Sequence, residues 1–293
     1  METGTQKYRA LVIAADSGSI ASAAAHMGYS VSSVSRMVSD LETECGFPLL
    51  ERSKFGVKPT SDGARMIACA RRILAECDLF ESTAREIAGI KGGTVRVGTF
   101  SSIATHWLPS LLGEFSAEHP QIEYELLMGD YSEITSWIDE GRVDIGFLRE
   151  PIDARLESTR ILKDELMAVL PKDHPRAGAK AFPLTAFENE PFISIERGSD
   201  AEGPDLFARH GLHVSSAFST WDDYAIMAMV EAGLGIAMLP ALVLRRCAYD
   251  LAMVPLDVPA RRDIWVAWKA SRPLPIAAYA LLDLIHERAD ANV

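Results

Sequence analysis

The sequence predicts an α+β protein of several domains: an N-terminal winged helix-turn-helix, a long linker helix and a C-terminal two-lobed α/β domain. Three observations lead to this prediction. Short amphipathic helices separated by turns occupy the N-terminal segment, apolar residues repeat every seven positions across residues 60–90, and strands alternate with helices from residue 94 onward. A chain of 293 residues has room for about two domains, or three when one is small.

Charge is unevenly distributed along the chain, whose net charge is −12. Residues 1–72 hold nine Lys and Arg against seven Asp and Glu, whereas the remainder holds 20 against 34. An acidic surface repels nucleic acid over most of its area. Any contact with DNA is therefore expected to come from the N-terminal segment.

The segment "SVSSVSRMVSDLE" at positions 30–42 predicts an amphipathic helix. Its apolar side consists of residues at helical spacing, namely Val31, Val34, Val38 and Leu41. The opposite side carries Ser32, Arg36 and Ser39, and Ser30 stands at the expected N-cap. Because serine is a mediocre helix former, we expect the valine side to be held against a core.

Two shorter helices are expected before this one. The first has Tyr8, Leu11, Val12 and Ala15 at helical spacing. Ser19 caps the second, "IASAAAHM", and Gly28 with Tyr29 makes a tight turn into the serine-rich helix. This order is typical of a helix-turn-helix, in which slim hydroxyls let a recognition helix enter a major groove about 12 Å wide. The alternative is the solvated face of any small helical domain.

The stretch "FPLLERSKFGVKPTSDG" at positions 47–63 predicts a two-stranded wing. It begins with the strand-like piece Phe47–Leu50, and three cations lie near the glycine turn that follows. Cations in such a wing contact DNA phosphates. The candidate DNA-binding residues are therefore Ser30, Ser32, Ser33, Ser35, Arg36, Ser39, Arg52, Lys54 and Lys58.

The N-terminal segment resembles the LysR-type transcriptional regulators, through "SGSIASAAAHMGYSVSSVSRMVSDLE" and "CGFPLLERSKFGVKPTSDG". This resemblance implies a DNA-binding regulator. The sequence departs from the family pattern after Ser30, where Val31 and Ser32 replace the usual glutamine and proline. Met37 and Ser39 also stand where longer polar side chains are usual. The resemblance therefore covers the phosphate-anchoring parts and implies no operator sequence.

One long helix is expected from Thr60 to about Ile90, capped by Thr60 or Ser61 and ended by the glycines of "KGGT". Two rows of residues seven apart form a heptad seam along it: Met66, Ile73, Phe80 and Ile87, with Ala70, Cys77 and Ala84. The seam favours pairing with a second chain, and the alternative is a helix packed on its own domain. The resemblance implies a homodimer or homotetramer with paired linker helices, and thus an operator with two half-sites.

The remaining residues alternate strands such as "TVRVGTF", "IEYELLM" and "VDIGFL" with helices, which indicates parallel sheets covered by helices. "VRVGTFSS", "VDIGF" and "VEAGLGIAMLP" resemble the LysR effector domain, itself similar to periplasmic binding proteins. The expected domains are a winged helix-turn-helix at 1–60, a linker or dimerisation helix at 61–91 and a regulatory domain at 92–293. Within the last, lobe 1 is expected at about 92–161 and 266–293, and lobe 2 at about 162–265.

Ligands of open α/β sheets lie at the carboxyl ends of strands. Ser101 and Ser102 follow the first strand, where hydroxyls and free N–H groups suit an anion such as a carboxylate. Ordinary N-capping is the alternative, although the resemblance implies that this turn lines the effector pocket. The two lobes are expected to enclose a cleft between them. On its other side we expect Phe147, Arg197 and Trp221, each after a strand, to contact the effector. Arg197 as a surface charge and Trp221 as a core residue are the alternatives.

Other functional classes find little support. Neither a signal peptide nor an apolar run of membrane-span length is apparent, so we expect a cytoplasmic protein without a membrane partner. The four cysteines form no C-x-x-C pair, and Cys69 and Cys77 are interpreted as small apolar residues, with redox sensing as the alternative. No residue completes a metal site beside His210 and His213, and no catalytic motif occurs. We therefore expect no enzyme and no cofactor except a small-molecule effector.

The function expected is that of a ligand-responsive transcriptional regulator. A small molecule between the lobes would change how the subunits pack and how they engage double-stranded DNA. The alternative is a cytosolic small-molecule-binding or enzymatic α/β protein whose N-terminal helices serve only dimerisation.

Overall fold

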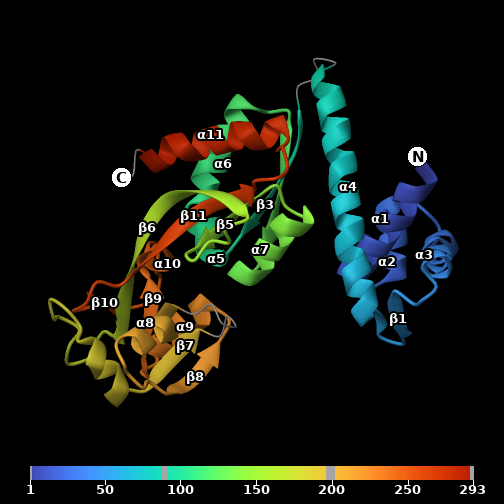
Figure 1. Ribbon diagram of the computed structural model, residues 1–293. Helices are drawn as coiled ribbons and strands as arrows, with labels where there is room; N and C mark the ends of the chain where they lie inside the picture. The colour runs from blue at the N-terminus through green and yellow to red at the C-terminus, as the bar shows by residue number, and fades with distance from the viewer. Residues whose placement is uncertain (1, 88–91, 196–201, 291–293) are drawn as a thin grey trace.

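The computed structural model describes residues 2–87, 92–195 and 202–290, and in it one long helix stands between an N-terminal domain and a two-lobed body (Figure 1). The elements of the N-terminal domain are α1 (Glu2–Ser17), α2 (Ile20–Met27), α3 (Val31–Cys45), β1 (Leu50–Ser53) and β2 (Gly56–Pro59). The three helices pack on one another around a small apolar core. This domain has the winged helix-turn-helix architecture that the sequence predicts.

The predicted helix caps of this domain are confirmed. The side-chain oxygens of Ser19 and Ser30 accept hydrogen bonds from backbone N–H groups in the first turns of α2 and α3. Thr60 Oγ1 likewise accepts from the N–H of Gly63, 2.8 Å away, at the start of α4 (Ser61–Ile87). Each cap satisfies a backbone donor that a helix leaves without an intrahelical partner.

Two details of the domain differ from the prediction. Val31 is 52% exposed rather than buried, because it is the first residue of α3 and the covered part of that helix begins one turn later at Val34. The wing strand begins at Leu50 and not at Phe47, since the residues before it form a turn. Glu42 fixes this turn, because its Oε1 accepts hydrogen bonds from the N–H groups of Leu49 and Leu50.

The body contains one continuous sheet in the order β4-β3-β5-β11-β6-β9-β7-β8, with β10 also paired to β6. Its strands are β3 (Gly93–Thr99), β4 (Ile122–Met128), β5 (Ile145–Arg149), β6 (Leu156–Pro171), β7 (Phe192–Ile195), β8 (Ser216–Thr220), β9 (Ile236–Pro240), β10 (Leu251–Pro255) and β11 (Arg261–Lys269). The other elements are α5 (Ser101–His106), α6 (Leu108–Glu118), α7 (Tyr131–Glu140), the 3₁₀ helix η1 (Leu184–Asn189), α8 (Glu202–Arg209), α9 (Asp223–Glu231), α10 (Ala241–Leu244) and α11 (Ile276–Asp290).

Two lobes arise because one strand, β6, runs through both halves of this sheet, whereas β11 pairs with β5 and with the first part of β6. In lobe 1, β3 is parallel to β4 and β5, and in lobe 2, β7 is parallel to β8 and β9. The long strand β6 pairs with β11 up to Glu165 and with β9 from Leu166 onward. Each lobe has its own apolar core, so the junction consists of two strands and the side chains beside them.

Helices cover both faces of each half of the sheet. In lobe 1, α6 and α11 pack together on one face and α7 covers the other (Figure 1). In lobe 2, η1 and α8 enclose one core and α9 with α10 encloses a second. Among the described helices, none is both long enough and apolar enough to cross a membrane.

Substitution of Gly63 tests how closely the linker helix packs against the turn before the wing. A Cβ at this position would lie 1.9 Å from the carbonyl oxygen of Leu49. We expect Gly63→Ala to lower the free energy of unfolding of the N-terminal domain by about 1–3 kcal/mol, because overpacking forces the backbone apart. Hydrogen exchange in urea, read from peptides of this domain, measures the change.

Gly113→Ala is the matched control, because Gly113 lies in α6 with open space where a Cβ would stand. There alanine is expected to stabilise lobe 1 by roughly 0.5–1 kcal/mol through helix propensity. A Gly63→Ala variant as stable as the native protein would contradict the close packing described.

Candidate nucleic-acid interface and interlobe cleft

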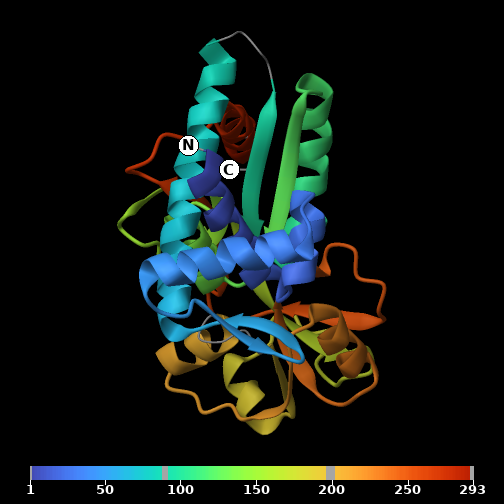
Figure 2. The same ribbon diagram turned by 90° about the vertical axis from the view of Figure 1, so that its right-hand side faces the viewer.

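The outer side of α3 is uncovered. In Figure 2 this helix lies across the front of the molecule with the β1–β2 hairpin beside it, and no other element stands before it. Ser32, Arg36 and Ser39 are exposed there, as the helical spacing predicts. The acidic body lies on the far side of α4, so this surface is free to contact another molecule (Figure 1).

The serines of this segment hydrogen-bond to one another and to the wing. Ser30 Oγ lies 2.9 Å from Ser32 Oγ and 2.7 Å from Ser33 Oγ. The guanidinium of Arg52 donates to Ser35 Oγ at 3.0 Å and to Ser39 Oγ at 3.2 Å. These two hydrogen bonds join β1 to α3, so wing and helix form one surface. Sequence reasoning placed the three residues on that surface but missed that they bind each other.

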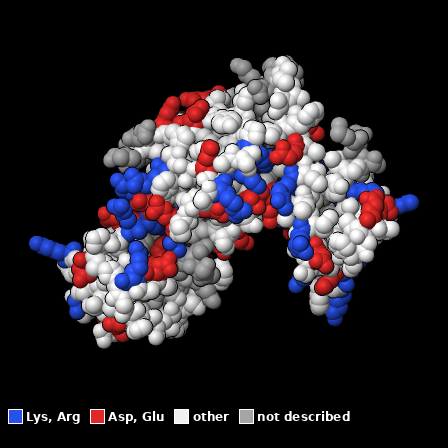
Figure 3. All heavy atoms as spheres, viewed as in Figure 1, with Lys and Arg blue, Asp and Glu red and all other residues white. Residues whose placement is uncertain are grey.

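The wing presents its remaining cations outward. Lys54 and Phe55 form the two-residue hairpin tip, where Phe55 is 88% exposed and Lys54 Nζ lies 5.0 Å from the centre of its ring. Lys58 is exposed on β2 opposite Glu51. Figure 3 shows Lys and Arg atoms gathered at the lower end of the N-terminal domain, where Figure 1 places the wing.

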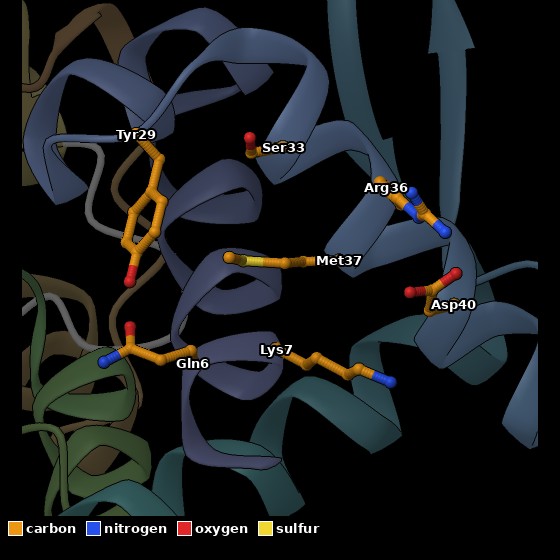
Figure 4. Close-up of a pocket in the computed structure, with 7 residues that line it drawn as sticks. All are labelled: Gln6, Lys7, Tyr29, Ser33, Arg36, Met37 and Asp40. Atoms are coloured by element: carbon orange, nitrogen blue, oxygen red, sulfur yellow. The ribbon is translucent and has the colours of Figure 1, made fainter. Parts of the chain in front are cut away.

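A groove of about 480 Å³ lies between α1 and α3, next to the exposed guanidinium of Arg36. Figure 4 shows its lining residues: Gln6, Lys7, Tyr29, Ser33, Arg36, Met37 and Asp40. Lys7 is held at its edge by an ion pair with Glu44 at 2.5 Å, a contact that also raises the pKa of Lys7. Gln6 and Lys7 come from α1 and the other residues from α3 or the turn before it, so no local spacing in the sequence marks this groove.

The heptad residues of α4 divide into two groups. Met66 packs on the core of its own N-terminal domain, Ala70 is buried, and Cys77 is half-buried. Further along, the seam faces outward, with Phe80 71% exposed and Ile87 83% exposed. Ile73 and Ala84 are exposed with them. The seam is therefore only in part a free surface, since its first two residues serve the fold of the chain itself.

Ion pairs join the linker helix to both of its neighbours. Arg71 on α4 pairs with Asp16 of α1 at 2.5 Å and also binds Glu140 at the end of α7. A second chain of contacts runs from Arg9 of α1 through Asp78 of α4 to Arg96 of β3. The N-terminal domain, the linker and lobe 1 are thus connected by charged side chains within one subunit.

A buried arginine lies at the junction of the lobes. Arg262 on β11 is 5% exposed, and its Nε and Nη2 donate to Asp164 Oδ2 on β6 at 2.9 and 2.8 Å. Its Nη1 donates to Glu202 Oε1, the first residue of α8, and to Tyr131 Oη, both at 3.1 Å. Its Nη2 also donates to Ser102 Oγ at 2.8 Å. The guanidinium is therefore surrounded by acceptors from four separate elements.

A second interlobe pair lies one turn along α8. Arg149 at the end of β5 pairs with Asp205 at 2.9 Å, and its guanidinium lies 5.5 Å from the centre of the Tyr131 ring. Burial raises the pKa of the Tyr131 phenol well above its ordinary value, so the phenol stays protonated and donates to Glu202 at 2.9 Å. A cavity of about 730 Å³ opens beside these residues.

The predicted effector residues fall in different surroundings. Ser102 is buried against Arg262, and Ser101 is half-buried as the first residue of α5; the N-cap there is Phe100, so capping does not explain the serines. Phe147 lies instead in the core of lobe 1, because its position on β5 points it at Trp107. Trp221 is 62% exposed after β8, and not a core residue. Arg197 lies outside the described residues.

The residues that surround Arg262 were missed in the sequence, apart from Ser102. They carried no shared spacing, since Asp164 and Arg262 are 98 positions apart. In the part of the chain that the structure describes, no group of three His, Cys, Asp or Glu side chains could hold a metal ion. Cys69 is exposed, and each of the four cysteines is a free thiol.

Two segments of the chain match known families. Residues 5–64 match the family described as bacterial regulatory helix-turn-helix protein, lysR family, and residues 88–290 match the LysR substrate binding domain. The probable HTH-type transcriptional regulator LrrA of Synechococcus elongatus is 31% identical over 284 residues, 95% of each chain. BenM of Acinetobacter baylyi is 28% identical over 80% of this chain and 79% of its own.

Solved structures of two other proteins, CbnR and BenM, share the fold over nearly the whole chain. The crystal structure of CbnR, a LysR family transcriptional regulator, has a TM-score of 0.72 and 22% identity, covering 97% of this chain and 99% of its own. Full-length CbnR complexed with its target DNA gives 0.71 at the same identity and coverage. Full-length BenM gives 0.62 at 24% identity, covering 98% of this chain and 97% of its own.

The buried network makes a stability prediction. Arg262→Met leaves Asp164 and Glu202 without their counter-charge, and we expect a loss of about 3–5 kcal/mol in the free energy of unfolding of the body. Urea denaturation followed by tryptophan fluorescence measures it, because all tryptophans lie between Trp107 and Trp268.

Arg155→Met is the control for this substitution. Arg155 is an exposed cation of lobe 1 paired with Asp153 at 2.7 Å, and such surface pairs contribute about 0–1 kcal/mol. Equal losses in the two variants would show that burial of Arg262 carries no special weight.

Proposed function

The chain belongs to the LysR family of bacterial transcriptional regulators, and from this we propose that it binds operator DNA through α3 and the wing. The observation that carries the proposal is the uncovered surface of α3, fastened to the wing by Arg52. Short hydroxyls on this surface allow a close approach to duplex DNA. Arg36 reaches a phosphate or a guanine, and Lys54 and Lys58 neutralise phosphates beside the groove. The shared fold with the CbnR–DNA complex supports this assignment.

Base reading in this chain rests on few side chains. Val31, Ser32, Met37 and Ser39 depart from the usual family residues, and Ser39 is already engaged by Arg52. On the outer side of α3, Ser32 and Arg36 are exposed beside the engaged Ser39. We propose that Tyr29, which lines the groove next to Arg36, adds an aromatic contact there.

Self-association is proposed through the exposed part of the α4 seam. Ile73, Phe80, Ala84 and Ile87 present apolar surface that a partner helix would bury. A dimer formed there places two recognition helices on one duplex, hence two half-sites. A second apolar surface lies on the edge strand β4, where Tyr124, Leu126 and Met128 are exposed at alternate positions. Two separate surfaces on one chain support a homotetramer over a homodimer.

The effector is proposed to bind in the interlobe cleft, and α7 is proposed to carry its effect to the N-terminal domain. This helix begins at Tyr131, which contacts Glu202 and Arg262, and ends at Glu140, which binds Arg71. Arg71 in turn holds Asp16 of α1. A ligand that favours one arrangement of the lobes would thereby bias the packing of the subunits on DNA, in proportion to its differential affinity.

No cofactor besides the effector, no catalytic role and a cytoplasmic location complete the proposal. Curated relatives of the chain are named as transcriptional regulators, which supports regulation rather than catalysis. The alternative, an α/β enzyme whose N-terminal helices only dimerise, would leave the uncovered α3 and wing without a role.

Binding to the DNA upstream of the protein's own gene tests the proposal. We expect one preferred site, with affinity falling steeply as salt is added. Replacing Lys54 and Lys58 together by alanine is expected to lower the slope of log affinity against log salt by about two per subunit. Fluorescence anisotropy over a salt series measures both.

A double variant in which Lys172 and Lys180 are replaced by alanine provides a matched loss of two charges, because both are exposed cations on lobe 2, which lies apart from the wing (Figure 1). Its slope should equal that of the native protein. Absence of any preferred site on this DNA would favour the enzymatic alternative.

The α4 surface is tested by Phe80→Glu. A charge at this exposed apolar position is expected to weaken subunit association by at least about tenfold, since it would be desolvated in the interface. Sedimentation across a concentration series measures the shift. Tyr279→Glu on α11, also exposed, serves as the control, and equal behaviour of the two variants would refute the α4 interface.

A further inference from the structure

We propose that Glu202 is a tethered carboxylate that fills the anion site of the cleft, and that a carboxylate effector binds by displacing it. The inference rests on the proposed function in one respect, namely that the cleft receives the effector.

Glu202 is held as a bound carboxylate ligand would be held. Its Oε1 accepts from Arg262 Nη1 at 3.1 Å and from Tyr131 Oη at 2.9 Å, two donors that converge on one oxygen. Burial raises the pKa of the Glu202 carboxyl, but Arg262, Tyr131 and Arg149 outweigh it and keep the pKa below its ordinary value. The carboxylate is therefore ionised inside the protein, and its hydrogen bonds are charge-assisted.

Arg262 does not need Glu202 for its neutrality. Asp164 faces it directly across β6 and β11 and accepts from two of its nitrogens. Asp164 is fixed in place, because its other oxygen accepts from the N–H of Leu242 at 2.8 Å. Glu202 is thus a second carboxylate on an arginine that already has a permanent partner. A second anion at such a position can leave without stranding a buried charge.

Glu202 and its two donors come from opposite sides of the cleft. Glu202 is the first residue of α8 in lobe 2, whereas Tyr131 belongs to lobe 1 and Arg262 to β11, which pairs with β5 of lobe 1. One turn further, Asp205 pairs with Arg149 of lobe 1. Removing Glu202 from its donors therefore loosens one of the two ion pairs that fasten α8 to lobe 1. Ligand entry and the spacing of the lobes become linked by a single exchange of carboxylates.

The approach to this site is a cavity of about 730 Å³ lined by charged side chains of both signs. Four are arginines, Arg149, Arg209, Arg261 and Arg262, and four are carboxylates, Glu150, Glu202, Asp205 and Asp263. Figure 3 shows basic and acidic side chains interleaved where the lobes meet. A small carboxylate that enters this cavity can reach the two donors that Glu202 now occupies, Arg262 Nη1 and Tyr131 Oη.

Acetate is the probe, because it reproduces the end of the Glu202 side chain without a tether. The shift of the unfolding midpoint by sodium acetate, against sodium chloride at equal ionic strength, is measured for the full chain and two variants. Glu202→Ala vacates the site and Glu202→Gln fills it with a neutral amide, a weaker competitor. Acetate affinity is expected to rise from the native chain to the glutamine variant to the alanine variant, by about tenfold or more overall. The reason is that acetate binds only the fraction of molecules in which Glu202 has left the site, so the apparent affinity is the intrinsic affinity multiplied by that fraction.

Asp250→Ala is the matched control, since Asp250 is an exposed carboxylate of lobe 2 paired with Lys172 at 2.6 Å. Its response to acetate should equal that of the native chain. Equal acetate responses in native, glutamine and alanine variants would overturn the proposal, and so would a response confined to the control. If the alanine variant does not fold, the order of native and glutamine chains still decides.

Failure here is distinguishable from failure of the regulator assignment. The acetate measurement involves no DNA, and the salt series on the wing variants involves no acetate. Specific DNA binding without a Glu202-dependent acetate response would leave the regulator intact and refute the tethered carboxylate. A Glu202-dependent acetate response without specific DNA binding would support the anion site and refute the regulator function proposed for it.

Discussion

The pairing of β6 with β11 is the constraint on which the body depends. These two strands carry the chain between the lobes, and Arg262 faces Asp164 directly across them. A shift of one residue in their register would turn the arginine to the opposite face and leave both charges without partners. The buried pair therefore fixes the position of one lobe against the other at the place where the cavity opens.

The same arginine brings four elements to one point. Ser102 from α5, Tyr131 from α7 and Glu202 from α8 all bond to it beside Asp164. One continuous helix, α7, extends from Tyr131 in this network to Glu140, which binds Arg71 of the linker. The cleft and the N-terminal domain are then joined by one helix and two sets of ion pairs. Such a connection suits two alternative arrangements better than a gradual deformation.

The structure of the N-terminal domain explains why its third helix is rich in serine. The hydroxyls of Ser35 and Ser39 hold Arg52, and that of Ser30 caps the helix. Part of the serine-rich face therefore binds the wing within the domain, and Ser32 and Arg36 face outward. Low helix propensity is offset by burial of Val34 and Val38 beneath.

The sequence alone determined the order of the domains, the helix caps at Ser19, Ser30 and Thr60, and the heptad rows of the linker. These features depend on neighbours within a few positions, so periodicity and capping chemistry reveal them. Only the tertiary structure decided that Phe147 lies in a core, that Val31 is exposed and that the first two residues of the seam serve their own chain. The tertiary structure alone placed Ser102 beside Arg262, 160 positions away. The residues of this network come from separate strands and helices that meet only in the folded chain, so no regular spacing in the sequence reveals them.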